Sequence, residues 1–164
     1  MLVMTTNETT NTCCFFGHKT IEESKSLKEK LYPVIENLIV REKVDTFLFG
    51  SKSPFDSLCL NIVTNLKEKH PHIKRVYVRA EYPIIDESYL AYLLESYDET
   101  YFPEKLLGAG KAVYVERNYE MIHKSHFCVV YYDNTYAPAK RKSGTKLAHA
   151  YAEKHNRVII NILD

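Results

Sequence analysis

Small, cationic and hydroxyl-bearing residues directly follow three apolar runs of this sequence. The groups are Gly17-His18-Lys19, Gly50-Ser51-Lys52 and Arg79, after the runs at 12–16, 44–49 and 73–78. Glycines let a ligand approach the backbone, and exposed amides together with cationic side chains bind anions. We therefore expect a phosphate-binding edge where these runs end.

A fourth group lies near the end of the chain, in the stretch 140–151, KRKSGTKLAHAY. Three basic residues, including Lys142, precede Ser143, Gly144 and Thr145, and the pattern indicates that a helix begins at the Gly-Thr pair. The positive end of a helix flanked by cations attracts a phosphate. Alone this signal is weak, but its recurrence after several runs predicts a ligand that carries phosphate.

The elements that must position these residues alternate between strands and helices. The strand-like runs at 12–16, 44–49, 73–78, 126–132 and 157–163 are continuously apolar, as expected for parallel strands covered on both faces, and 111–115 is a further candidate. Segments whose apolar residues recur at the spacing of a helix lie between these runs. The fold class is therefore α/β, with one Rossmann-like domain, a mostly parallel sheet and helices on both faces. Ligands bind such sheets at the carboxyl ends of the strands.

Local signals set the expected helix ends. Thr20 and Glu23 match a capping box before the first helix, where Pro33 predicts a kink or a break. Ser53 and Pro54 suit the start of the second helix.

The segment at about 81–104 differs from the rest of the chain. It has seven acidic residues, no Lys or Arg, and six Tyr or Phe side chains. We expect an acidic, tyrosine-rich insertion that is partly helical. It either packs on its own domain or forms a dimer surface or a ligand lid.

Composition bounds the remaining possibilities. The chain has 164 residues and a formal net charge of +1, which is typical of one globular domain and gives no sign of a general nucleic-acid binder. We expect a flexible tail over 1–11, a domain over 12–164, no signal peptide, no membrane span and a cytoplasmic location. The four cysteines form no CxxC, so we expect them reduced and buried. We expect no cofactor and no metal.

Four segments together resemble the SLOG superfamily, in particular the small stand-alone SLOG proteins of Firmicutes and their phages. They are CCFFGHK, FLFGSKSPFD, VERNYEMIHKSHFCVVYYD and SGTKLAHAYA, and the resemblance extends over about residues 12–164. The superfamily joins the lonely-guy phosphoribohydrolases with the DNA-processing Smf/DprA proteins. The resemblance implies a nucleotide-derived ligand at the strand ends and a homodimer or higher homo-oligomer.

The lonely-guy motif is an Arg, a Met four residues later, a strand, and then P-G-G-x-G-T-x-x-E. Arg117 and Met121 match its first part, and Gly144 and Thr145 match the G-T. The P-G-G is absent, and Ala148 stands where the catalytic Glu belongs. That Glu stabilises a cationic sugar in the enzymes, which alanine cannot do. Glu153 and Glu116 are conceivable substitutes.

The resemblance adds Arg117, as a phosphate clamp, and Asn118, as a ribose or base contact, to the candidate ligand-binding residues. We expect binding without cleavage of a nucleotide-derived signal, such as an ADP-ribose derivative or a cyclic nucleotide, by a sensor or by a sponge for anti-phage defence signals. Two alternatives stay open: a nucleoside-monophosphate phosphoribohydrolase, and single-stranded DNA binding, against which the acidic segment argues.

Overall fold

The computed structural model describes residues 11–22, 24–133, 135 and 144–164. Six parallel strands form one sheet in the order β4-β3-β2-β1-β5-β6. The strands are β1 (Thr12–Gly17), β2 (Thr46–Phe49), β3 (Lys74–Val78), β4 (Glu99–Tyr101), β5 (Phe127–Tyr131) and β6 (Val158–Asn161). The predicted fold class is confirmed: this is a Rossmann-like α/β domain with an all-parallel sheet.

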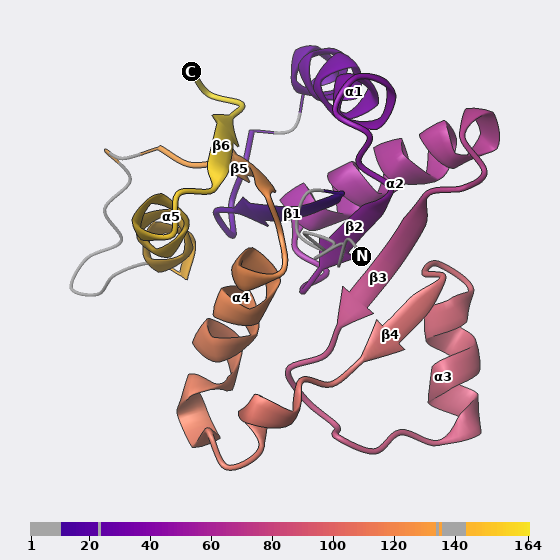
Figure 1. Ribbon diagram of the computed structural model, residues 1–164, viewed down its shortest axis with the longest axis vertical. Coiled ribbons are helices and arrows are strands. Elements are labelled where there is room, and N and C mark those ends of the chain that lie inside the picture. The colour runs from indigo at the N-terminus through magenta and orange to yellow at the C-terminus, as the bar shows by residue number, and fades with distance from the viewer. Residues whose placement is uncertain (1–10, 23, 134, 136–143) are drawn as a thin grey trace, which may run out of the picture.

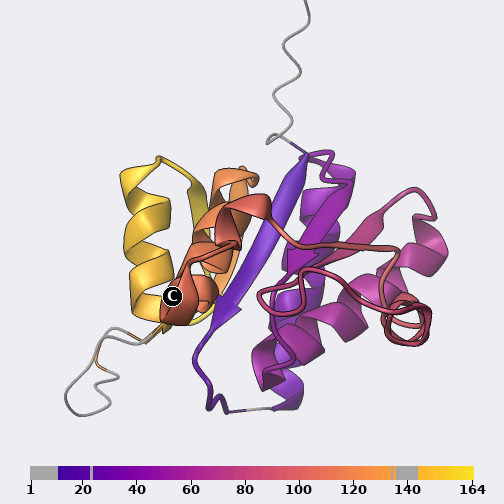
Figure 2. The same cartoon turned by 90° about the horizontal axis from the view of Figure 1, so that it is seen from below.

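Helices cover both faces of this sheet (Figures 1 and 2). α1 (Lys25–Val40) and α2 (Pro54–Lys69) lie on one face, and α4 (Val113–His123) and α5 (Gly144–Lys154) on the other; α3 (Glu87–Leu94) lies beside β4. Side chains alternate between two cores because successive strand residues point to opposite faces. In β1, Cys13 and Phe15 pack toward α1 and α2, whereas Cys14 and Phe16 pack toward α4 and α5.

The four cysteines are buried and form no disulfide bond, as the sequence predicts. Cys14 and Cys128 are paired across β1 and β5, with 3.5 Å between their sulfur atoms. They fill the core as small apolar side chains.

Several local predictions need correction. Ser24, rather than Thr20, caps α1, by accepting a hydrogen bond from the Leu27 amide. α1 runs unbroken through Pro33. Residues 111–115 form no strand: the short 3-10 helix η2 (Gly110–Ala112) leads directly into α4, whose buried residues Arg117 and Met121 stand one helical turn apart. A run of five residues is too short to distinguish the two periods.

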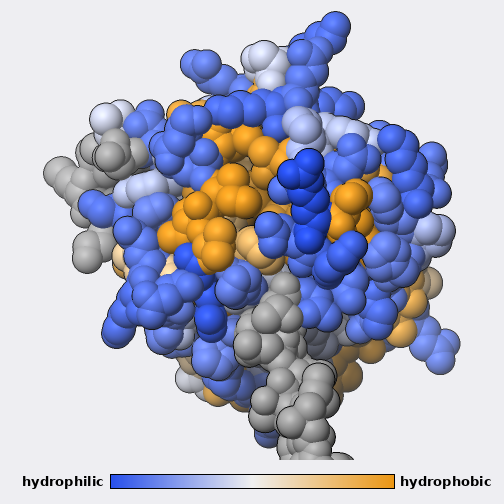
Figure 3. All heavy atoms as spheres, turned by 45° about the horizontal axis from the view of Figure 1, so that its top comes forward, coloured by the Kyte–Doolittle hydropathy of each residue, from blue (hydrophilic) through white to orange (hydrophobic). Residues whose placement is uncertain are grey.

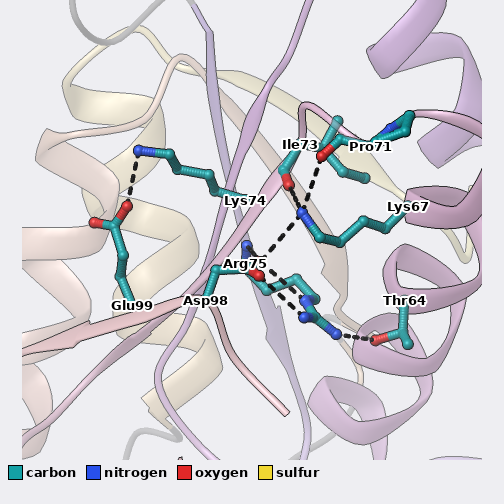
Figure 4. Close-up of polar contacts among 8 residues, drawn as sticks. All are labelled: Thr64, Lys67, Pro71, Ile73, Lys74, Arg75, Asp98 and Glu99. Carbon is teal, nitrogen blue, oxygen red and sulfur yellow. Dashed lines mark hydrogen bonds and ion pairs between the residues drawn. The ribbon is translucent and has the colours of Figure 1, made fainter. Parts of the chain in front are cut away.

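The acidic, tyrosine-rich segment packs against its own domain. It forms α3, the edge strand β4 and the 3-10 helix η1 (Glu104–Leu106). β4 is missing from the sequence prediction because it is short, half-exposed and polar. Asp98, just before β4, accepts hydrogen bonds from the amide and guanidinium of Arg75 at 2.8–3.1 Å and forms an ion pair with Lys67, while Lys74 pairs with Glu99 (Figure 4). These contacts hold the segment at the sheet edge.

The surface shown in Figure 3 is mostly hydrophilic, with apolar residues gathered near its centre. Within the described ranges, no helix combines the length and the apolar character that crossing a membrane requires.

Candidate functional site

The site is built at the carboxyl ends of β1, β2 and β5. β1 lies between the other two, and the chain leaves it toward β2 on one side and later returns to β5 on the other. This is the switch point at which open α/β sheets bind ligands. The fold thereby brings together Gly17 and His18 from the end of β1 and Gly50 and Ser51 from the end of β2, as the sequence predicts.

His18 links the ends of β1 and β5. Its amide donates to the Tyr131 carbonyl at 3.3 Å, and its ring Nε2 accepts from the Asp133 amide at 2.9 Å. An Nε2 that accepts a hydrogen bond carries no proton, so the bond selects the neutral ring. Burial also lowers the pKa of His18. The imidazole is therefore a neutral part of the site near pH 7.

The two strand-end glycines allow close packing. A Cβ on Gly17 would lie 2.6 Å from Cβ and Cγ of Phe55, and one on Gly50 would lie 2.7 Å from Arg117 Nε and Met121 Sδ. α2 and α4 can therefore approach the strand ends only because glycine stands at both positions. The space above each glycine is filled by protein rather than left for a ligand.

Arg117 lies in the middle of α4, away from the N-terminus of that helix. The residue is 8% exposed, and its guanidinium donates through Nη1 to the Gly50 carbonyl and through Nε to Asn118 Oδ1 at 3.1 Å. Within the described residues it forms no ion pair with Glu116 or Glu120, which pair with Lys105 and Lys124 instead. Burial lowers the pKa of Arg117, and the nearby carboxylate of Asp56 opposes this. Arg117, 67 positions after Gly50 in the sequence, thus places a cation at the switch point.

Asp56 is the functional candidate that sequence reasoning missed. It is 4% exposed, and its Oδ2 accepts hydrogen bonds from both the amide and the hydroxyl of Ser51, each at 3.0 Å. Burial raises its pKa to about 6, against the Ser51 hydrogen bonds and the attraction of Arg117, which lower it. The spacing Ser53-x-x-Asp56 is that of a capping box and was the available signal. A carboxylate in the first turn of a helix is ordinarily exposed, so this spacing did not indicate a buried Asp56.

The cations after β2 and β3 turn toward the acidic segment. Arg79 donates to the Tyr82 and Pro83 carbonyls at 3.2 and 3.5 Å and to Thr100 Oγ1 at 3.1 Å. Lys52 donates to the Tyr92 hydroxyl at 3.1 Å and lies over that ring. Neither is brought to the β1–β5 crevice.

A hollow of about 150 Å³ lies between α2 and α3, lined by Lys52, Ser57, Leu60, Tyr92, Leu93, Ser96 and Tyr97. It is distinct from the strand-end crevice, since none of the residues at the ends of β1 and β5 lines it. Lys19 is exposed in the turn after β1.

Gly144 and Thr145 form the first turn of α5, as predicted, and Thr145 is buried. Lys142 and Ser143 lie outside the described residues, as does the predicted tail up to residue 10. Ala148 is 1% exposed and packs in the core between α5 and the sheet.

The two carboxylates considered as substitutes have other partners. Glu153 pairs with His149 at 3.2 Å and Glu116 with Lys105 at 3.9 Å, both partly exposed. Asp56 is therefore the carboxylate that the described structure brings to Arg117.

Aromatic rings border the β5 end of the site. The Tyr132 ring stacks on His149 of α5, 4.6 Å between centroids, and lies 5.6 Å from the His18 ring. Tyr131 instead packs against Phe55 and accepts a hydrogen bond from the Glu22 amide. Of this pair, Tyr132 has the ring nearer to His18, and aromatic rings of this kind can stack on bases.

The comparisons with known proteins give one relative. No family model matches the chain. The chain is 30% identical over 146 residues to the uncharacterized SPbeta prophage-derived protein YoqJ of Bacillus subtilis (strain 168), a match that covers 78% of this chain and 81% of YoqJ. At that identity and coverage, the chain belongs to the same protein family as the prophage protein YoqJ.

Proposed function

We propose that this protein binds a nucleotide-derived small molecule at the carboxyl ends of the strands without cleaving it. The ligand class is an ADP-ribose derivative or a cyclic nucleotide signal, and the protein acts as a sensor or a sponge for it. The observation that carries the proposal is Arg117, a buried guanidinium fixed at the switch point by the Gly50 carbonyl. A buried, oriented guanidinium is a strong recognition group for phosphate.

Three features support the absence of cleavage and the biological setting. Ala148 removes the carboxylate of the lonely-guy motif, and its side chain faces the core. Glu153 and Glu116 are engaged at the surface. The relationship to a prophage-derived protein supports a role in phage biology, where sequestration of a defence signal is useful.

The test is mass spectrometry of small molecules released from the purified protein by denaturation, followed by thermal shift measurements. The panel is AMP, ADP-ribose, cyclic ADP-ribose isomers and cyclic dinucleotides. We expect one nucleotide to be recovered intact and to stabilise the protein stoichiometrically, because a ligand that binds only the folded state raises its stability.

Arg117→Ala should abolish that stabilisation, with Arg41→Ala, an exposed arginine at the end of α1, as the matched control. Arg117→Lys keeps the charge but not the planar fork, and serves if the alanine variant does not fold. No retention and no stabilisation by any member of the panel would refute the proposal.

The phosphoribohydrolase alternative draws on one observation, the titratable carboxylate of Asp56 beside Arg117. The same incubations decide it. Catalytic release of free base from AMP, lost in Arg117→Ala, would show an enzyme in place of a binder.

A further inference from the structure

The hydrogen-bond donors of the β2 turn are already committed to a carboxylate of the protein. The amide and the hydroxyl of Ser51 both donate to Asp56, and Asp56 is almost fully buried in the first turn of α2. An anion that approaches the Gly50-Ser51 turn therefore meets a negative charge instead of a cradle of free donors. Binding at this end of the crevice must take that charge into account.

Arg117 is the cation that acts on Asp56: Arg117 bonds to the Gly50 carbonyl, and Asp56 bonds to the next residue, Ser51. The other titratable groups that interact with Asp56 are Tyr77 from β3, Tyr97 ahead of β4 and Cys59 one turn along α2. Burial raises the pKa of all three, so they are uncharged near neutral pH. Arg117 thus stands opposite the buried carboxylate of Asp56, and the exposed carboxylate of Glu81 acts on Arg117 more weakly.

Arg117 has a donor left for a ligand. Nη1 bonds to the Gly50 carbonyl and Nε to Asn118, whereas Nη2 has no hydrogen bond to any residue of the described ranges. A phosphate on Nη2 would share Arg117 with the Asp56 carboxylate. Two anions close to one cation repel each other, and the one that can take a proton becomes neutral.

We propose that Asp56 makes ligand binding proton-linked: a phosphate bound at Arg117 is taken up together with a proton from solvent on Asp56. This rests on the proposed function and adds its regulation, because the site then holds its ligand more tightly as pH falls from about 8 to about 6. Asp56 is a positioning residue, since it acts through Arg117 and the Ser51 turn.

The experiment is isothermal titration calorimetry with ADP-ribose, and with cyclic di-AMP as a second probe. Both carry phosphodiester-type charges that stay constant over this pH range, so proton uptake reports on the protein. Titrations at pH 7 in two buffers of different ionisation enthalpy give the number of protons bound per ligand. If the phosphate raises the Asp56 pKa from about 6 to about 7, we expect about 0.4 proton, and Kd about fivefold higher at pH 8 than at pH 6.

Asp56→Asn keeps an acceptor for Ser51 and removes the titration. We expect it to bind with a Kd independent of pH and with no proton uptake. His18→Gln is the second variant, because it removes the ring that joins the ends of β1 and β5, and we expect the proton uptake to stay intact in it.

Each outcome is decisive. Binding of a probe by the wild type without proton uptake overturns the proton linkage and leaves the proposed function standing. Linkage that persists in Asp56→Asn and vanishes in His18→Gln assigns the proton to His18 and also overturns it. Absence of binding of either probe at every pH refutes the proposed function in this form, and the linkage with it.

Discussion

Replacing Asp56 with asparagine should stabilise the unliganded protein at neutral and higher pH. The carboxyl is buried, and its pKa is about 6 in the folded protein against an ordinary value of 3.8. The folded state therefore holds the proton more tightly than the unfolded state. An aspartate whose pKa is raised by folding imposes no cost below about pH 3.8. The cost grows as pH rises through this window and is complete above about pH 6.

The size of the effect follows from the shift. A pKa raised from 3.8 to about 6 corresponds to about 3 kcal/mol at pH 8, and to about half of that at pH 5, where the titration is partial. Between pH 5 and pH 8 the stability of Asp56→Asn relative to the wild type should therefore rise by roughly 1 kcal/mol. A constant offset from altered Ser51 hydrogen bonds cancels in this comparison.

The assay is urea unfolding of the wild type and the variant at both pH values, with the free energy of unfolding taken from the transition midpoint and slope. Glu68→Gln, which removes an exposed carboxylate from the same helix, should show no such change. A difference between Asp56→Asn and the wild type that is independent of pH, or that falls as pH rises, would refute a buried acid with a raised pKa.

Two further substitutions test the packing at the end of β1 and the attachment of the acidic segment to the sheet edge. Gly17→Ala should cost about 3 kcal/mol of stability, because its Cβ would lie 2.6 Å from the fully buried Phe55 ring, which cannot yield; calorimetric melting measures this, and an unchanged melting temperature would contradict the packing argument. Asp98→Ala should lower the free energy of unfolding by about 2 kcal/mol at neutral pH, because it removes the hydrogen bonds to Arg75. Burial opposes ionisation, but these bonds hold the Asp98 pKa below its ordinary value. The stabilisation by Asp98 is therefore present above about pH 4 and disappears as pH falls. Urea unfolding at pH 7 and pH 3 checks the sign, and an equal cost at both would count against it.

The sequence by itself determines the class of this fold and the edge of the sheet at which the candidate residues gather. Continuous apolar runs predict buried parallel strands, and the β1, β2, β3, β5 and β6 segments follow them because burial on both faces leaves no room for alternation. Caps such as Ser53 and the start of α5 at Gly144 are local signals, set within one helical turn. The strand ends that carry Gly17 and Gly50 could thus be placed at one edge without a structure.

The tertiary structure alone decides which of the candidates meet. Arg117 reaches the Gly50 carbonyl across 67 positions of sequence, and no local pattern encodes such a contact. Arg79 and Lys52 look equivalent to it in sequence, yet the packing of the acidic segment draws them to the Tyr82 carbonyl and the Tyr92 hydroxyl. From its position in the first turn of α2, Asp56 would be expected to be an exposed residue, but the packing of α2 against the sheet buries it. Burial, a property of the whole fold, then turns a common carboxylate into the group with a pKa of about 6 at the centre of the site.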